Sequence, residues 1–336
     1  MKRIVVAGHS CVDLIPRLPA HPSLEAGELV DIGPLAMVPG GSVVNTGQAL
    51  VELGMPVEIV TTAGDDALGD HLRDHIARLS PRHVIRRVSG VGTSYSVVLE
   101  HDGRSRTIWH HIGSATAFTG EELDPAGAEL VHLGYPTALP ALIADDARAF
   151  HAVLARIKAS HATSSVDLST LPASQPSAQW PGLLHRVLPS IDVFTPSADD
   201  LVSIGWLAPH PTTDQIADAA DRLCAAGSAI VMVSDGARGA YLCAADSGRL
   251  FRGGHALLPL AESWSGHRSW IPAEPVARVV TTNGAGDTAS AGLLYGILNG
   301  YAPAEAGRFA ATLAARRIGG LGLADATANP TDATTG

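Results

Sequence analysis

Short apolar runs alternate with longer segments of helical periodicity along most of the chain. Runs such as 3–8 (RIVVAG) and 57–64 (VEIVTTAG) have the length and composition of buried strands, and segments such as 42–53 and 67–79 have helical length and spacing. Further strands are expected at 129–134, 164–169, 192–197, 229–236 and 277–280, and further helices at 141–160, 214–226 and 287–298. This order predicts an α/β fold of βαβ units with a doubly wound, mainly parallel sheet.

Two stretches interrupt the alternation. Residues 94–112 predict a hairpin that turns at Asp102-Gly103, and 27–41 is another strand-like excursion. Together they predict a small β-sheet lid over the strand ends, although an edge hairpin without a role fits the pattern too. We therefore expect a core of 1–12, 42–91 and 113–323, a lid of 13–41 and 92–112, and a disordered polar tail at 324–336.

Composition limits the possible partners. The formal net charge is −10 and the only lysines are Lys2 and Lys158, which argues against nucleic-acid binding. An anionic ligand would have to be held by arginines, backbone N–H groups, helix N-termini or a metal. No run is apolar for the length of a membrane span, and three cysteines are too few for a disulfide framework, so we expect a cytoplasmic protein.

One stretch suggests phosphate chemistry. In 281–292 (TTNGAGDTASAG), the backbone N–H groups of Gly284, Ala285, Gly286 and Asp287 could form an anion hole at the start of a helix. A carboxylate beside a phosphate makes sense if Asp287 accepts a proton from an attacking hydroxyl. A plain strand-to-helix turn with Asp near the N-cap fits the same pattern.

A second stretch near the N-terminus suits a polyhydroxylated ligand. The glycine pair Gly40-Gly41 lets a ligand approach the backbone, and Asn45 can both donate and accept hydrogen bonds. Asp13 follows the first strand and offers a carboxylate. Asp13 and Asn45 are candidate sugar ligands, with an Asx turn and a helix cap as the alternative.

Taken together, these stretches resemble the signatures of the ribokinase family, also called PfkB-type carbohydrate kinases. Residues 40–54 (GGSVVNTGQALVELG) look like its N-terminal signature and 281–296 (TTNGAGDTASAGLLYG) like its C-terminal signature, and the resemblance covers about residues 3–322. It implies a Rossmann-like, ribokinase-like fold, an ATP- and Mg²⁺-dependent kinase acting on a sugar or sugar derivative, and a homodimer formed through the lid.

The resemblance also implies roles for individual residues. Asp287 matches the catalytic base, and Gly284, Ala285 and Gly286 match the anion hole. The substrate-binding positions correspond to Asp13, Gly40, Gly41 and Asn45. Ser234, Gly236 and Gly239 match a nucleotide-binding turn, Asn283 is assigned to the cofactor, and Asp200 to the metal.

The chain departs from the family pattern at two places. In 196–200 (PSADD), Ser197 and Asp200 replace the usual Asn and Glu, so Asp200 would reach Mg²⁺ through water. Thr281 replaces an Asp that helps bind an activating monovalent cation in relatives, so we expect weak or absent potassium activation. A nucleoside kinase of the same fold and a non-catalytic sugar- or nucleotide-binding regulator remain as alternatives.

Overall fold

A nine-stranded sheet forms the centre of the molecule. The computed structural model describes residues 2–18, 25–101, 105–172, 174–175 and 177–326. The strand order is β13-β12-β11-β10-β9-β8-β1-β4-β5, and every neighbouring pair is parallel except β11–β12 and β12–β13. The strands are β1 (Ile4–Gly8), β4 (Val57–Gly64), β5 (Arg82–Val88), β8 (Leu130–Gly134), β9 (Thr163–Asp167), β10 (Val193–Phe194), β11 (Ile230–Ser234), β12 (Ala240–Ala244) and β13 (Arg268–Ile271). The prediction of a doubly wound, mainly parallel sheet is confirmed.

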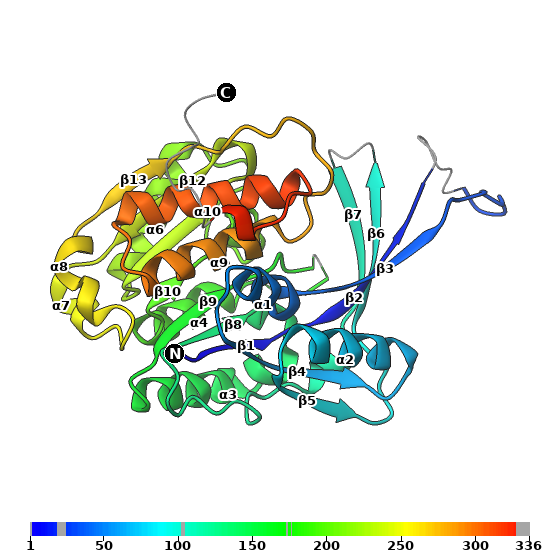
Figure 1. Ribbon diagram of the computed structural model, residues 1–336, viewed down its shortest axis with the longest axis horizontal. Helices are drawn as coiled ribbons and strands as arrows, with labels where there is room; N and C mark the ends of the chain where they lie inside the picture. The colour runs from blue at the N-terminus through cyan, green and yellow to red at the C-terminus, as the bar shows by residue number, and fades with distance from the viewer. Residues whose placement is uncertain (1, 19–24, 102–104, 173, 176, 327–336) are drawn as a thin grey trace.

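Helices cover both faces of this sheet and divide the core in two. One apolar cluster includes residues of α3, α4, α5 and α6, and the other includes residues of α1, α2, α9 and α10. Figure 1 shows α1, α9 and α10 in front of the sheet. The helices are α1 (Ser42–Glu52), α2 (Ala67–Leu79), α3 (Pro140–Ala159, kinked at 144–147), α4 (Trp180–Val187), α5 (Ala198–Ser203), α6 (Thr213–Ala225), α7 (Ser247–Phe251), α8 (Ala261–Trp264), α9 (Ala285–Leu298) and α10 (Pro303–Ile318).

The expected strand at 277–280 is wrong. This segment belongs to a long loop between β13 and α9 that arches toward the second sheet (Figure 1). Val279 and Val280 are about half exposed, and Val280 N donates to Ile318 O at the end of α10 rather than to a strand. The edge of the sheet is taken by β13 instead, which pairs antiparallel with β12.

A separate four-stranded sheet rises beside the core, as the lid prediction expects (Figure 1). Its order is β3-β2-β6-β7, made of β2 (Cys11–Pro16), β3 (Leu35–Gly40), β6 (Tyr95–His101) and β7 (Ser105–His111). The expected hairpin turn at Asp102-Gly103 lies outside the described residues. We call this sheet the lid. Asp13 is level with Ser96 in the register, and Ser96 with His110, so these three share one face of it.

The sheet reverses its winding between β1 and β8. These strands are parallel neighbours, but β4 and β5 follow on the β1 side, whereas β9, β10 and β11 follow on the β8 side. In open α/β sheets the loops that leave two such strands diverge, and ligands bind between them at the carboxyl ends of the strands; we call this place the crevice. His9 and Tyr135, the first residues after β1 and β8, stand at this crevice.

Of the expected tail, Ala324–Ala326 form a short 3-10 helix, and 327–336 lie outside the described residues. Within the described ranges, no helix has both the length and the apolar character needed to cross a membrane.

Candidate active site

The first turn of α9 lies beside the crevice, because Asp287 contacts Tyr135, the residue that follows β8. Helix α9 begins at Ala285 after Gly284, which adopts a left-handed φ of 75°. Asp287 in this first turn is 3% exposed, yet it meets side chains from two other elements. Tyr135 donates its hydroxyl to Asp287 Oδ1 at 2.7 Å, and Asn45 Nδ2 on α1 donates to Oδ2 at 2.9 Å. The structure thus brings the predicted base and the predicted substrate ligand Asn45 into direct contact.

Burial makes Asp287 more basic than an ordinary aspartate. Loss of water raises the pKa of its carboxyl, while hydrogen bonds from Tyr135, Asn45 and Ser42 partly oppose the rise. A raised pKa makes a carboxylate a better proton acceptor near neutral pH. Asp287 therefore has the electrostatics expected of a general base.

Two more buried carboxylates lie close enough to influence Asp287 or one another. Burial and the charges of Asp287 and Asp200 raise the pKa of Asp167, at the end of β9, well above its usual range. Burial also raises the pKa of Asp200 to about 6, although hydrogen bonds from Ser197 and Thr170 oppose the rise. Three negative charges would repel one another here. A bound cation or a proton on one of the three carboxyl groups would relieve that repulsion.

The lid brings Asp13 to the other side of the crevice. Asn283 Nδ2 donates to Asp13 Oδ2 at 2.7 Å, so Asn283, which we expected at the cofactor, has its side chain on the predicted substrate ligand. Gly40 is needed here because a Cβ at this position would lie 2.5 Å from the same Oδ2. Gly41 has a φ of 80° and passes beside His9. Asp13, Gly40, Gly41 and Asn45 are thus gathered around the crevice.

Of the backbone donors expected at the start of α9, Ala285 N already donates to Thr282 O at 3.4 Å. The first hydrogen bond of the helix runs from Thr288 N to Gly284 O, so the N–H groups of Gly286 and Asp287 have no acceptor within the helix. A Cβ added to Gly286 would meet no atom within 4 Å, which shows open space beside it. An anion could approach this helix terminus.

The predicted nucleotide turn lies between β11 and β12. Gly236 and Gly239 have left-handed φ values of 52° and 105°, and a Cβ at Gly239 would lie 2.1 Å from Ile271 O. Ser234 N donates to Pro196 O at 3.2 Å, which joins this turn to the segment that carries Asp200. The predicted metal and nucleotide positions are therefore neighbours.

Sequence reasoning missed His9, Tyr135 and Asp167 as site residues. Each lies at, or directly after, the carboxyl end of a parallel strand, and His9 and Tyr135 follow the two strands that flank the winding reversal. That position was the available signal, but it required the strand order.

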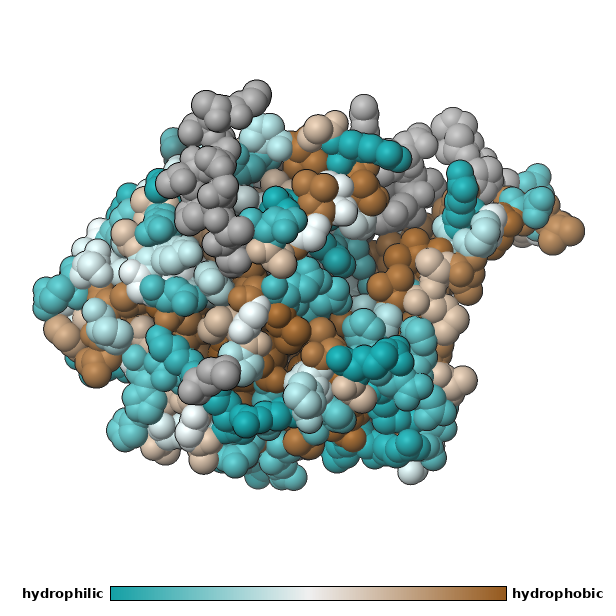
Figure 2. All heavy atoms as spheres, viewed as in Figure 1, coloured by the Kyte–Doolittle hydropathy of each residue, from teal (hydrophilic) through white to brown (hydrophobic). Residues whose placement is uncertain are grey.

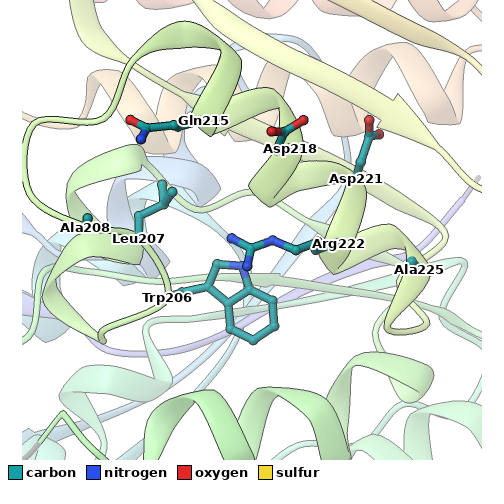
Figure 3. Close-up of a pocket in the computed structure, with 8 residues that line it drawn as sticks. All are labelled: Trp206, Leu207, Ala208, Gln215, Asp218, Asp221, Arg222 and Ala225. Carbon is teal, nitrogen blue, oxygen red and sulfur yellow. The ribbon is translucent and has the colours of Figure 1, made fainter.

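The large surface pocket drawn in Figure 3 is a different place. It has a volume of about 680 Å³ and lies against α6 and the chain before it. The Arg222 guanidinium lies over the Trp206 ring, 5.8 Å from its centroid. It shares no residue with the crevice around Asp287.

A comparison with protein-family models decides the family. The model described as "pfkB family carbohydrate kinase" matches residues 1–331. The chain belongs to this family. The resemblance of its two signatures is thereby confirmed. Among curated proteins, none matches this PfkB family chain significantly.

Solved structures of similar fold include kinases for sugars and for nucleosides. Ribokinase of Arabidopsis thaliana, complexed with ribose and ATP, is 22% identical over 94% of this chain and 92% of its own, with a TM-score of 0.71. A nucleoside kinase of Burkholderia thailandensis in complex with inosine is 18% identical over 96% and 93%, with a TM-score of 0.65. Adenosine kinase of Sinorhizobium meliloti is 17% identical over 98% and 99%, with a TM-score of 0.71. The ribokinase-like fold of this PfkB family member is therefore established.

Proposed function

We propose that this PfkB family member transfers the γ-phosphate of ATP to a hydroxyl of a sugar or sugar derivative, with Asp287 as the catalytic base. The observation that carries the proposal is the position of Asp287: a buried carboxylate of raised pKa at a helix N-terminus, in contact with Asn45 and Tyr135. The base and the backbone donors for the transferred phosphate then belong to the same turn of α9.

The mechanism follows from these positions. Asp13 and Asn45 bind acceptor hydroxyls and orient the one that reacts toward Asp287. The acceptor hydroxyl displaces one of the hydrogen-bond donors on Asp287 and gives its proton to the carboxylate as its oxygen attacks the γ-phosphorus. The N–H groups of Gly284, Ala285 and Gly286 stabilise the charge on the transferred group, with Ala285 N exchanging Thr282 O for a phosphate oxygen. Ser234, Gly236 and Gly239 lie under the nucleotide. Positioning and electrostatics supply most of the rate in such transfers.

The carboxylates beside this turn suit Mg²⁺. Asp167 and Asp200 offer the oxygen ligands that Mg²⁺ prefers, and Mg²⁺ when bound would neutralise phosphate charge. Both oxygens of Asp200 already accept hydrogen bonds, from Ser197 and Thr170, so Asp200 would act through a water. In the described part of the chain no three acidic, histidine or cysteine side chains are placed to hold an ion alone, so we propose that phosphate oxygens share it.

Release of ADP tests the activity. Purified protein with Mg-ATP is assayed against pentoses, hexoses, sugar acids and nucleosides. Turnover of sugars supports the proposal, turnover of nucleosides alone supports the nucleoside kinase, and ligand binding without any turnover supports the regulator. The nucleoside kinase remains a candidate because two of the similar structures are such enzymes.

We expect Tyr135→Phe to move the acid limb of the pH profile to higher pH. The Tyr135 hydroxyl stabilises the charged form of Asp287, so its loss raises the pKa of the base further and leaves less carboxylate at low pH. At pH 6, kcat/KM should fall about tenfold, and the two proteins should converge as the pH rises. Tyr295→Phe, on the helix α9 that carries Asp287, is the control. If the acid limb of the pH profile does not move in Tyr135→Phe, the Tyr135 hydroxyl does not control the pKa of the base.

We expect potassium to have little effect on the rate, because Thr281 stands where relatives carry a cation-binding Asp. Initial rates in potassium and in sodium chloride at equal ionic strength should agree within about twofold. A strong preference for potassium would contradict this expectation.

We propose a homodimer that forms through the lid. Strand pairing places Met37, Leu14, Val97 and Trp109 in one row across the lid face opposite Asp13. Met37 and Trp109 are 42% and 54% exposed, and Figure 2 shows apolar surface over the described part of the lid. An exposed apolar face of this kind marks a protein–protein interface, and the lid of a second copy would bury it.

Light scattering after size exclusion tests the dimer. The 34.6 kDa chain should elute at twice its mass, and Trp109→Glu should shift it toward the monomer. Phe251→Glu, an exposed aromatic on α7 away from the lid, should leave the dimer intact. A monomeric wild-type protein at micromolar concentration would refute the lid dimer.

A further inference from the structure

His9 is a buried histidine whose two ring nitrogens have no hydrogen-bond partner among the described residues. It follows β1 at the winding reversal and is 4% exposed. Buried ring nitrogens are normally paired, so an unpaired ring at a crevice points to a group supplied from outside.

The ring lies between the predicted base and the lid. It stacks on Tyr135 at 6.0 Å between centroids, and the Tyr135 hydroxyl reaches Asp287. On another side His110 of the lid meets it edge-on at 5.2 Å. Gly41 leaves room for it, because a Cβ there would lie 2.8 Å from His9 Nδ1. His9 thus lines the acceptor side of the crevice.

The chemistry of the ring limits what it can bind. Burial, helped by His110, lowers the pKa of His9 to about 3, so the imidazole is neutral at physiological pH. A neutral imidazole has one donor and one acceptor nitrogen, which suits a hydroxyl. It offers no charge to a carboxylate or phosphate.

The neighbouring polar groups favour the same class of ligand. Ser96 Oγ and His110 Nδ1 form a hydrogen bond of 3.1 Å, and the Cys11 thiol donates to Asp13 Oδ1 at 3.4 Å. These side chains are therefore already paired. The carboxylate of Asp13 would repel an anion at this position.

We propose that His9 is a specificity-determining residue whose imidazole binds a hydroxyl of the acceptor, and that the acceptor is an uncharged sugar or nucleoside rather than a sugar acid or sugar phosphate. This rests on the proposed function of the same site.

Matched pairs of acceptors and three variants test the inference. Ribose and inosine are compared with ribose phosphate, inosine monophosphate and gluconate, each with Mg-ATP. His9→Phe keeps the stacked ring without its nitrogens, and His9→Asn keeps a neutral donor and acceptor and secures the test if the first variant is unstable. His255→Phe is the control, because His255 is exposed and contacts only His161 among ring partners in the described chain.

We expect turnover of the neutral acceptors alone. In His9→Phe, KM for the accepted compound should rise at least about tenfold with kcat within about threefold, His9→Asn should fall between, and His255→Phe should match wild type. An unchanged KM in both His9 variants, or preferred turnover of an anionic acceptor, would overturn the inference.

Binding measured by calorimetry separates this inference from the kinase assignment. If wild type phosphorylates none of the panel, the proposed function fails. Binding of a neutral compound that His9→Phe weakens about tenfold would still support the role of His9. Absence of binding to every compound, or tighter binding of the anionic ones, would refute it.

Discussion

Asp287→Asn should abolish turnover and raise the melting temperature. The asparagine keeps the size of the side chain, and its Oδ1 can still accept the Tyr135 hydrogen bond, but it cannot take a proton. Its Nδ2 would replace the acceptor of the Asn45 hydrogen bond, so the Asn45 amide must turn to offer its oxygen. Loss of a general base costs about a thousandfold or more in kcat. The pKa of the Asp287 carboxyl is higher in the folded protein than in the unfolded chain. Its contribution to the free energy of unfolding is therefore lost as the pH rises through the folded pKa. At pH 7.5 burial of the charged carboxylate lowers the stability of the fold. The amide removes that cost.

Steady-state rates and thermal melts at pH 7.5 test both halves of this prediction. ATP binding by calorimetry should be preserved, because the backbone donors of α9 are untouched. Turnover within tenfold of wild type would remove Asp287 from its assigned role, whatever the melting temperature. Asp214→Asn provides a control, since it replaces an exposed carboxylate on α6.

Gly41→Ala should both destabilise the protein and weaken acceptor binding. Gly41 has a φ of 80°, and an added Cβ would lie 2.8 Å from His9 Nδ1 and 2.9 Å from His9 O. At φ 80° and ψ 164° the backbone of Gly41 lies in a region essentially confined to glycine, which costs an L residue about 1–3 kcal/mol, and the clash adds about 2 kcal/mol. His9 must also move, so KM for the acceptor should rise.

Gly54→Ala is the comparison variant, because it places a side chain at a positive φ without a clash. Gly54 lies at the other end of α1 with a φ of 79°, and a Cβ there would meet no atom within 4 Å. It should therefore lose only about 1 kcal/mol and keep its KM. Denaturant melts and acceptor KM values of the two variants give the comparison. Equal losses of stability in Gly41→Ala and Gly54→Ala would mean that His9 and its neighbours can move to accommodate the added Cβ at no cost in free energy.

Local signals predicted the regular elements well. Helix α2 spans the expected residues because Asp66 caps its first turn, accepting from Gly69 N, and α1 ends before Gly54, whose φ of 79° favours glycine. The two glycine-containing signatures located most of the candidate site. Where the backbone must approach another group closely, glycine is required, and the glycine is visible in the sequence.

The misses required knowledge of tertiary contacts. The valines of 277–280 have strand propensity, but β13 occupies the sheet edge and the segment bonds to the end of α10. Tyr135 looks like an ordinary residue after a strand, and its contact with Asp287 comes from 152 residues away. No local pattern encodes such a pair.

The long reach of the site contacts has a consequence for folding. The Asp13–Asn283 and Asn45–Asp287 hydrogen bonds join residues 270 and 242 positions apart. Such non-local contacts form slowly, because the intervening chain must be organised before they close. During synthesis, a chain that has not yet reached α9 holds the lid strands and α1 without their partners. The ability to bind an acceptor should then appear only with the final step of folding, after most of the central sheet has formed.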